Sequence, residues 1–140
     1  MKLVAIFLLL VVLIIFSGCT TQQPPSNSPT PEVKEFKVKI SHSGYLFYIN
    51  NRPVLNPSVS LGDTVRLLAT SQTDEEDHNH GITIDEYKIN EAVKTANEKE
   101  PVVIEFIADK AGKFRIWCKT CEEGIFGSDH PEIEAVLEVG

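Results

Sequence analysis

The sequence has 140 residues, of which 42% are hydrophobic, and this length allows one folded domain with a packed core. Its formal net charge of -7 argues against nucleic acid and anionic lipid as binding partners. Only three cysteines occur, at Cys19, Cys118 and Cys121, so a fold held by many disulfides is excluded.

The N-terminal residues predict an export signal. Lys2 is followed by an unbroken apolar run from Leu3 to Phe16, and then by Ser17, Gly18 and Cys19. A basic start, an apolar stretch and small residues before a cleavage point are typical of secretory signal peptides. The cysteine after Ser-Gly resembles the lipidated cysteine of prokaryotic lipoproteins, although Phe16 replaces the usual aliphatic residue. We therefore expect a lipoprotein-type signal peptide over residues 1–18.

Lipidation of Cys19 would anchor the exported chain to the outer face of the cytoplasmic membrane. An uncleaved membrane anchor is the alternative, although the apolar run is shorter than the ~20 residues that span a bilayer. Residues 20–31 carry no aliphatic or aromatic side chain and are dense in proline, which predicts a disordered, solvated linker. The linker with its lipidated cysteine (19–31) then leads into a folded domain over residues 32–140.

The folded domain reads as short strands separated by turns. Between Val33 and Ile40, apolar and charged residues alternate, which is typical of a half-buried strand. Seven or eight strands are predicted, over 33–40, 45–49, 59–61, 64–70, 80–84, 101–107, 113–118 and 133–139, with a turn at Asn50-Asn51 that leads into residues 52–55. Residues 91–97 could form two helical turns. Many short strands at regular spacing predict an all-β fold, arranged as a Greek-key β-sandwich or barrel.

Potential metal ligands gather in two of the predicted connections. Cys118 and Cys121 follow a predicted strand, and His130 comes later in the same connection. His80 begins another strand, and His78 lies two residues before it, on the same face of an extended segment. Thiolates and imidazoles are the ligands that copper and zinc bind best. The sequence therefore predicts a metal site at one end of the sandwich, with His78 beside it as a weak or outer ligand.

Several segments match a known pattern: Gly62–Val65, His80-Gly81, Ala108–Gly112, Phe114–Cys118 and His130-Pro131. They resemble the cupredoxins, and especially the copper-A domain of cytochrome c oxidase subunit II and of nitrous oxide reductase. The resemblance implies that His80, Cys118, Cys121 and His130 bind one or two copper ions. It also implies a carrier of single electrons rather than an enzyme.

The spacing of the ligands departs from the family pattern. The family has Cys-x3-Cys-x3-His-x2-Met, whereas this chain has Cys-x2-Cys-x8-His, with Ile133 at the methionine position. A weak axial ligand must then come from elsewhere or be absent. Glu122, Glu123 and Glu132 are candidate oxygen donors.

Other interpretations of the same residues remain open. In an oxidising compartment Cys118 and Cys121 could form a disulfide. Together with His80 and His130 they could also hold a structural zinc ion, since two thiolates and two imidazoles complete a tetrahedral site. His42 is expected to be an exposed histidine of a turn. Trp117 is expected to be an ordinary core or rim aromatic, with shielding of the site or coupling to a partner as the alternatives.

Two functions use these residues. The first is electron transfer with a redox protein of a respiratory chain, for instance as an accessory of a heme-copper oxidase. The second is copper handling, in which the Cys-x-x-Cys pair binds Cu(I) and delivers it for assembly of another centre. Both keep the chain at a membrane through its lipid anchor, with no nucleic acid partner. A hydrolytic enzyme is set aside, because no motif marks a substrate pocket or a general base.

Overall fold

The computed structural model describes residues 30–72, 80–94, 96–122 and 133–140. The described strands are β1 (Val33–Ser41), β2 (Gly44–Ile49), β3 (Arg52–Val54), β4 (Ser58–Val59), β5 (Thr64–Ser71), β6 (His80–Ile84), β7 (Ile89–Val93), β8 (Val102–Ile107), β9 (Gly112–Trp117) and β10 (Glu134–Val139). A short 3-10 helix, η1 (Asp85–Tyr87), and a one-turn helix, α2 (Lys119–Glu122), complete them. Within these ranges no helix is long and apolar enough to cross a membrane.

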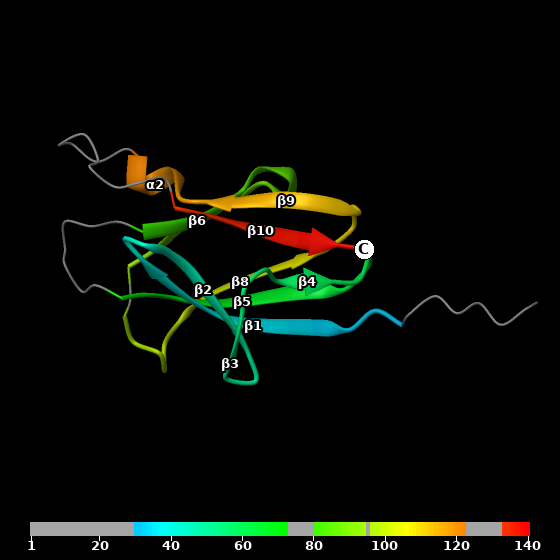
Figure 1. Ribbon diagram of the computed structural model, residues 1–140, viewed down its shortest axis with the longest axis horizontal. Coiled ribbons are helices and arrows are strands. Elements are labelled where there is room, and N and C mark those ends of the chain that lie inside the picture. The colour runs from blue at the N-terminus through cyan, green and yellow to red at the C-terminus, as the bar shows by residue number, and fades with distance from the viewer. Residues whose placement is uncertain (1–29, 73–79, 95, 123–132) are drawn as a thin grey trace, which may run out of the picture.

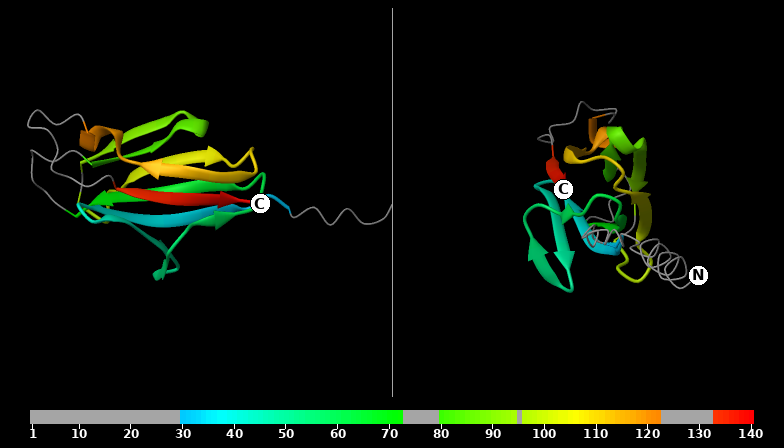
Figure 2. Two further views of the ribbon diagram at one scale, coloured as in Figure 1. Left: turned by 45° about the horizontal axis from the view of Figure 1, so that its top comes forward. Right: turned by 90° about the vertical axis from the view of Figure 1, so that its right-hand side faces the viewer.

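The strands form two five-stranded sheets that pack face to face (Figures 1 and 2). One sheet has the order β3-β2-β1-β5-β8 and the other β4-β10-β9-β6-β7. The β1–β5 and β4–β10 pairs are parallel, and the remaining pairs are antiparallel. The chain crosses repeatedly from one sheet to the other, so neighbours in a sheet are often distant in sequence. The predicted all-β sandwich is confirmed.

The core lies between the two sheets and follows the alternation seen in the sequence. Phe36, Val38 and Ile40 of β1 point inward and are fully buried, while the lysines between them face solvent. Further buried apolar residues come from the second sheet: Ile82, Ile84, Val93, Phe114, Ile116, Leu137 and Val139. Burial of this apolar surface is the main force that holds the sheets together.

The prediction of helical turns over residues 91–97 is wrong. Ile89–Val93 forms the edge strand β7, which pairs antiparallel with β6 so that Val93 lies opposite His80. Three consecutive residues of β7, from Asn90 to Ala92, are exposed, which removes the alternation that identifies a strand. Pairing with β6 and complete burial of Val93 override the local helical preference.

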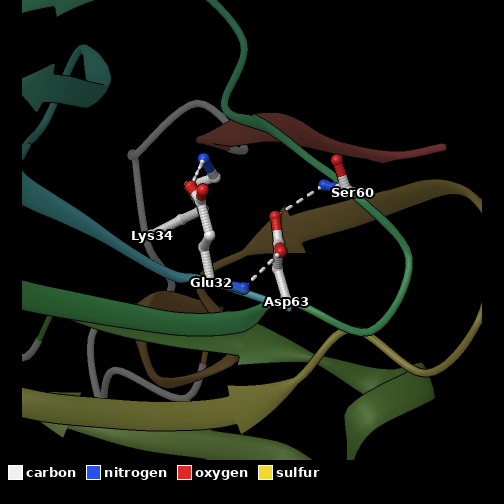
Figure 3. A network of polar contacts seen from close by, with 4 residues as sticks. All are labelled: Glu32, Lys34, Ser60 and Asp63. Carbon is white, nitrogen blue, oxygen red and sulfur yellow. Dashed lines mark hydrogen bonds and ion pairs between the residues drawn. The ribbon is translucent and has the colours of Figure 1, made fainter. Parts of the chain in front are cut away.

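Asp63 organises one end of the sandwich, which we call the Asp63 end (Figure 3). Its side chain is only 2% exposed, and its carboxylate accepts hydrogen bonds from the backbone N–H groups of Glu32 (2.9 Å) and Ser60 (2.8 Å). Its own carbonyl oxygen accepts from the N–H of Ala108 at 2.8 Å. The two hydrogen bonds to the carboxylate, led by that from the Glu32 N–H, hold the pKa of Asp63 below its ordinary value. The carboxylate thus joins the start of β1 to the β4–β5 turn, and the backbone carbonyl of the same residue adds the end of β8.

The opposite end carries the turn between β1 and β2, the start of β6 and the helix α2. In Figure 1 this end lies on the left, whereas the C-terminus lies on the right. Buried polar side chains from three strands gather here, namely Ser41 of β1, Ser71 of β5, and His80 and Thr83 of β6. We call it the His80 end.

Candidate metal site

His80, Cys118 and Cys121 come together at the His80 end. His80 is the first residue of β6, Cys118 follows directly after β9, and Cys121 lies on α2. Pairing of Thr83 with Trp117 sets β6 antiparallel to β9, so the start of one strand lies beside the end of the other. The potential ligand atoms of the three residues all lie within 4.8 Å of one another. The register between two strands therefore assembles a group that is scattered in the sequence.

The residues of this group are mostly buried. His80 is 2% exposed and Cys118 is 4% exposed, while Cys121 is partly buried. The backbone N–H of Gly81 donates to the Cys118 sulfur at 3.1 Å. Nδ1 of His80 lies 3.6 Å from the Cys121 sulfur.

Cys118 and Cys121 are joined by a disulfide in this structure, which is one of the alternatives that the sequence left open. The α2 turn brings the two residues together, because cysteines three apart on a helical turn lie on the same side. A disulfide sulfur is a poor metal ligand, so the pair must be reduced before both sulfurs can bind a metal.

Several predicted site residues lie outside the described residues: Cys19, His78, Glu123, His130 and Glu132. Glu122 ends α2, but the position of its side chain is likewise not described. The roles expected of these residues stay predictions. The described part of the predicted site is therefore His80 with the two cysteines.

His42 was expected to be exposed in a turn, and this prediction is wrong. It is partly buried at the tip of the β1–β2 hairpin, and its ring centre lies 5.2 Å from that of His80, with the ring planes at 69°. The sequence predicted the turn itself. It did not predict at which end of the sandwich the turn lies, because that position depends on the long-range pairing of β1 with β5.

No family model and no curated protein matches the sequence. Solved structures do match. The periplasmic domain of cytochrome oxidase subunit II from Bradyrhizobium japonicum aligns with a TM-score of 0.56 at 13% identity, over 76% of this chain and 83% of that one. Another match is subunit II of cytochrome c oxidase in a mixed disulfide with a thioredoxin-like protein, with a TM-score of 0.55 at 14% identity, over 82% and 87%.

A third match is the metal-binding domain of the Cu(I)-exporting P-type ATPase of Streptococcus pneumoniae, determined with Cu(I). It aligns with a TM-score of 0.53 at 14% identity, over 81% of this chain and 91% of that one. The chain has a cupredoxin fold. The resemblance drawn from the sequence is thereby confirmed at the level of the fold.

The cupredoxin frame is tied to the site through Tyr45. This residue of β2 is buried, and its hydroxyl group donates a 2.7 Å hydrogen bond to the carbonyl oxygen of Gly81, directly after His80. Burial raises the pKa of Tyr45, so the phenol stays protonated and remains a donor. The bond links the β1–β2 hairpin of one sheet to β6 of the other.

We expect Tyr45→Phe to lower the free energy of unfolding by about 1–2 kcal/mol, because the buried Gly81 carbonyl loses its donor. Urea denaturation followed by tryptophan fluorescence measures the change. Tyr48→Phe is the matched control, since Tyr48 lies on the outer face of the same strand and is partly exposed. Equal stability of Tyr45→Phe and the parent would show that the hydrogen bond does not hold the two sheets together.

Trp117 lies on the outer face of β9, where its indole N–H donates to Asp85 at 3.1 Å and the Arg115 guanidinium lies 4.9 Å from its ring centre. These contacts agree with a rim aromatic.

Ile133 is 5% exposed and packs in the cupredoxin core, so the position of the family methionine carries no potential ligand atom here.

Proposed function

We propose that this cupredoxin domain binds copper and carries single electrons outside the cytoplasm. The observation that carries the proposal is the close approach of one imidazole and two sulfurs, with all three ligand atoms within 4.8 Å. Two soft sulfur donors and an imidazole suit copper, with zinc as the alternative. His80, Cys118 and Cys121 would hold the metal, and His130 is the further ligand implied by the family resemblance.

The residues around the group suit electron transfer. Bound copper would supply a one-electron couple between Cu(II) and Cu(I). Strands β6 and β9 fix His80 and Cys118 in a buried setting, which limits movement of the ligands when the charge changes. The Gly81 N–H at the Cys118 sulfur draws electron density from it, and such hydrogen bonds tune the reduction potential of copper sites.

Metal binding first requires reduction of the disulfide. A dithiol protein is the reductant we propose: its thiolate attacks one sulfur of the pair, forming a mixed disulfide and releasing the other cysteine as a thiolate. Its second thiolate then resolves the mixed disulfide, so two electrons pass to Cys118 and Cys121 and the reductant becomes a disulfide. The mixed disulfide of a thioredoxin-like protein with oxidase subunit II supports such an exchange in a domain of this fold.

Copper delivery is the second candidate, and the Cys118–Cys121 disulfide favours it. If a disulfide of another protein took two electrons from the reduced pair by thiol–disulfide exchange, Cys118 and Cys121 would close into a disulfide, both sulfur ligands would be lost at once and the metal would be released. In this alternative the domain binds Cu(I) and passes it to the apo form of another copper protein.

For the cellular setting we propose export with lipidation of Cys19, so that residues 32–140 stand outside the cytoplasm on a flexible linker. The electron-transfer partner would be a respiratory redox protein. Support comes from the sequence of residues 1–31 and from the cupredoxin fold shared with a periplasmic oxidase domain.

The test is copper loading of the reduced and the disulfide form of the protein, followed by absorption and EPR spectroscopy. We expect uptake by the reduced form, with an intense sulfur-to-Cu(II) band and a reversible potential, and no such band from the disulfide form. The copper hyperfine pattern separates a single ion from a mixed-valence pair. Uptake of zinc but not of copper would overturn the proposal, and colourless binding of Cu(I) with transfer to an acceptor would establish delivery.

A further inference from the structure

We propose that His42 is an additional ligand of the same metal centre, an inference that rests on the proposed function. The described residues then provide two imidazoles and two thiolates, from His42, His80, Cys118 and Cys121. The ligands come from three places in the fold: the β1–β2 turn, the start of β6, and the β9–α2 junction.

The spacing of the two imidazoles supports this assignment. Two histidines that share one tetrahedral metal, with metal–nitrogen bonds of about 2 Å, have ring centres roughly 5 Å apart. The ring centres of His42 and His80 are 5.2 Å apart, and the Nε2 atoms of both rings are buried. The two ring centres are therefore close enough for a shared metal, but His42 lies outside the group whose ligand atoms are all within 4.8 Å of one another, so its ring would have to turn toward the sulfurs to bind.

The turn that carries His42 is held by its own hydrogen bonds. Ser41 and Gly44 pair across the hairpin, leaving His42 and Ser43 at its tip. The Ser41 hydroxyl oxygen accepts from the Ser43 N–H at 3.3 Å and lies 2.9 Å from the Ser43 hydroxyl. Gly44 has a φ of 133°, which a residue with a side chain rarely adopts. Such a turn restricts the positions that the His42 ring can reach.

The hairpin is also fixed relative to His80. The Tyr45 hydroxyl, three residues after His42, donates to the carbonyl of Gly81, one residue after His80. This bond crosses from one sheet to the other and joins the two histidine-bearing segments. His42 is thus positioned by the contact between the two sheets and not by the connection between β9 and β10.

The donor set has a chemical consequence. Ile133 supplies no ligand atom, so a centre built only from His80 and the two cysteines would lack a fourth donor. His42 would complete a four-coordinate set of two sulfurs and two nitrogens, which suits Cu(I) and Zn²⁺. His130 would then be a further ligand or none.

The experiment compares the reduced full chain with its His42→Ala, His130→Ala and Ser43→Ala variants, each loaded with Cu(II) and, separately, with Cu(I). Pulsed EPR counts the imidazole nitrogens coupled to Cu(II), and competition with a chromophoric chelator gives the Cu(I) affinity. We expect His42→Ala to lose one coupled nitrogen. Its Cu(I) affinity should fall by at least the roughly 10–100-fold that loss of an outer ligand partner costs. Ser43→Ala alters the same turn and should keep the nitrogen.

An unchanged nitrogen count in His42→Ala would overturn the inference and leave copper binding intact. A lower affinity with the full nitrogen count would also overturn it, because His42 would then only position His80. If the parent protein binds no copper, the proposed function fails, and Co(II) loading tests His42 independently. A Co(II) absorption spectrum that changes in His42→Ala supports ligation, whereas an unchanged spectrum or no uptake of Co(II) refutes it.

Discussion

Replacing Cys118 by serine is expected to remove most of the sulfur-to-copper absorption of the reduced protein, by tenfold or more, and to weaken copper binding strongly. Cys118 is the more buried sulfur of the pair, lies directly after β9, and accepts the Gly81 N–H. A serine hydroxyl stays protonated at neutral pH and is a hard oxygen donor, so it does not replace a soft thiolate on copper. Absorption spectra during copper titration measure the loss.

Cys121→Ser is the matched control, because both variants remove the same disulfide and differ only in which sulfur remains. Cys121 is partly exposed and lies on the single turn of α2. We expect the Cys121→Ser protein to retain a thiolate absorption band from Cys118 with a single copper. A band of parental intensity in Cys118→Ser would contradict the assignment of Cys118 as the principal sulfur ligand.

Replacing Asp63 by asparagine is expected to lower the free energy of unfolding by about 2 kcal/mol at pH 7, since hydrogen bonds to a buried charged group are among the stronger ones. The carboxylate accepts from two backbone N–H groups, those of Glu32 and Ser60. The isosteric amide has only one oxygen and presents an NH₂ group to the second donor. Urea denaturation at pH 7 measures the difference.

The pH dependence of stability gives a second readout for Asp63. Because its pKa in the folded protein lies below the ordinary value of 3.8, the carboxylate contributes stability that is fully present above the unfolded-state pKa. That contribution is lost as the pH falls through the folded-state pKa. Asp63→Asn should therefore lose less stability than the parent between neutral pH and about pH 3.

Asp109→Asn is the control for this experiment, because Asp109 is exposed in the β8–β9 turn near the same end of the sandwich. Because the side chain is exposed, Asp109→Asn should leave the free energy of unfolding at pH 7 close to that of the parent. An Asp63→Asn protein with the parental slope between pH 3 and pH 7 would show that another carboxyl group governs acid sensitivity.

The strands could be predicted from the sequence where one face of the strand is buried and the other is exposed to solvent. In β1 the alternation of Phe36, Val38 and Ile40 with lysines predicts a strand with one buried face. In β7 the exposed residues carry no such pattern, and only pairing with β6 specifies a strand. Asp63 was readable as a residue of a tight turn, but its links to the start of β1 and the end of β8 are long-range contacts that no local pattern encodes.

The site was partly predictable for a similar reason. Cys118 and His80 stand at a strand end and a strand start, and antiparallel pairing brings such positions together. The state of the cysteines was not predictable, because their spacing fits both a disulfide and a metal site. The contact between His42 and His80 was not predicted, because it depends on the packing of two sheets.

The direction in which β1 runs determines from which end of the sandwich a partner would approach the metal ligands. The strand starts at the Asp63 end and reaches the His80 end after nine residues, a length of about 30 Å. With the proposed lipid anchor upstream of Glu32, the attachment point and the metal ligands would occupy opposite poles of the sandwich. The linker would then leave the metal ligands open to a partner that approaches from the pole opposite the attachment point.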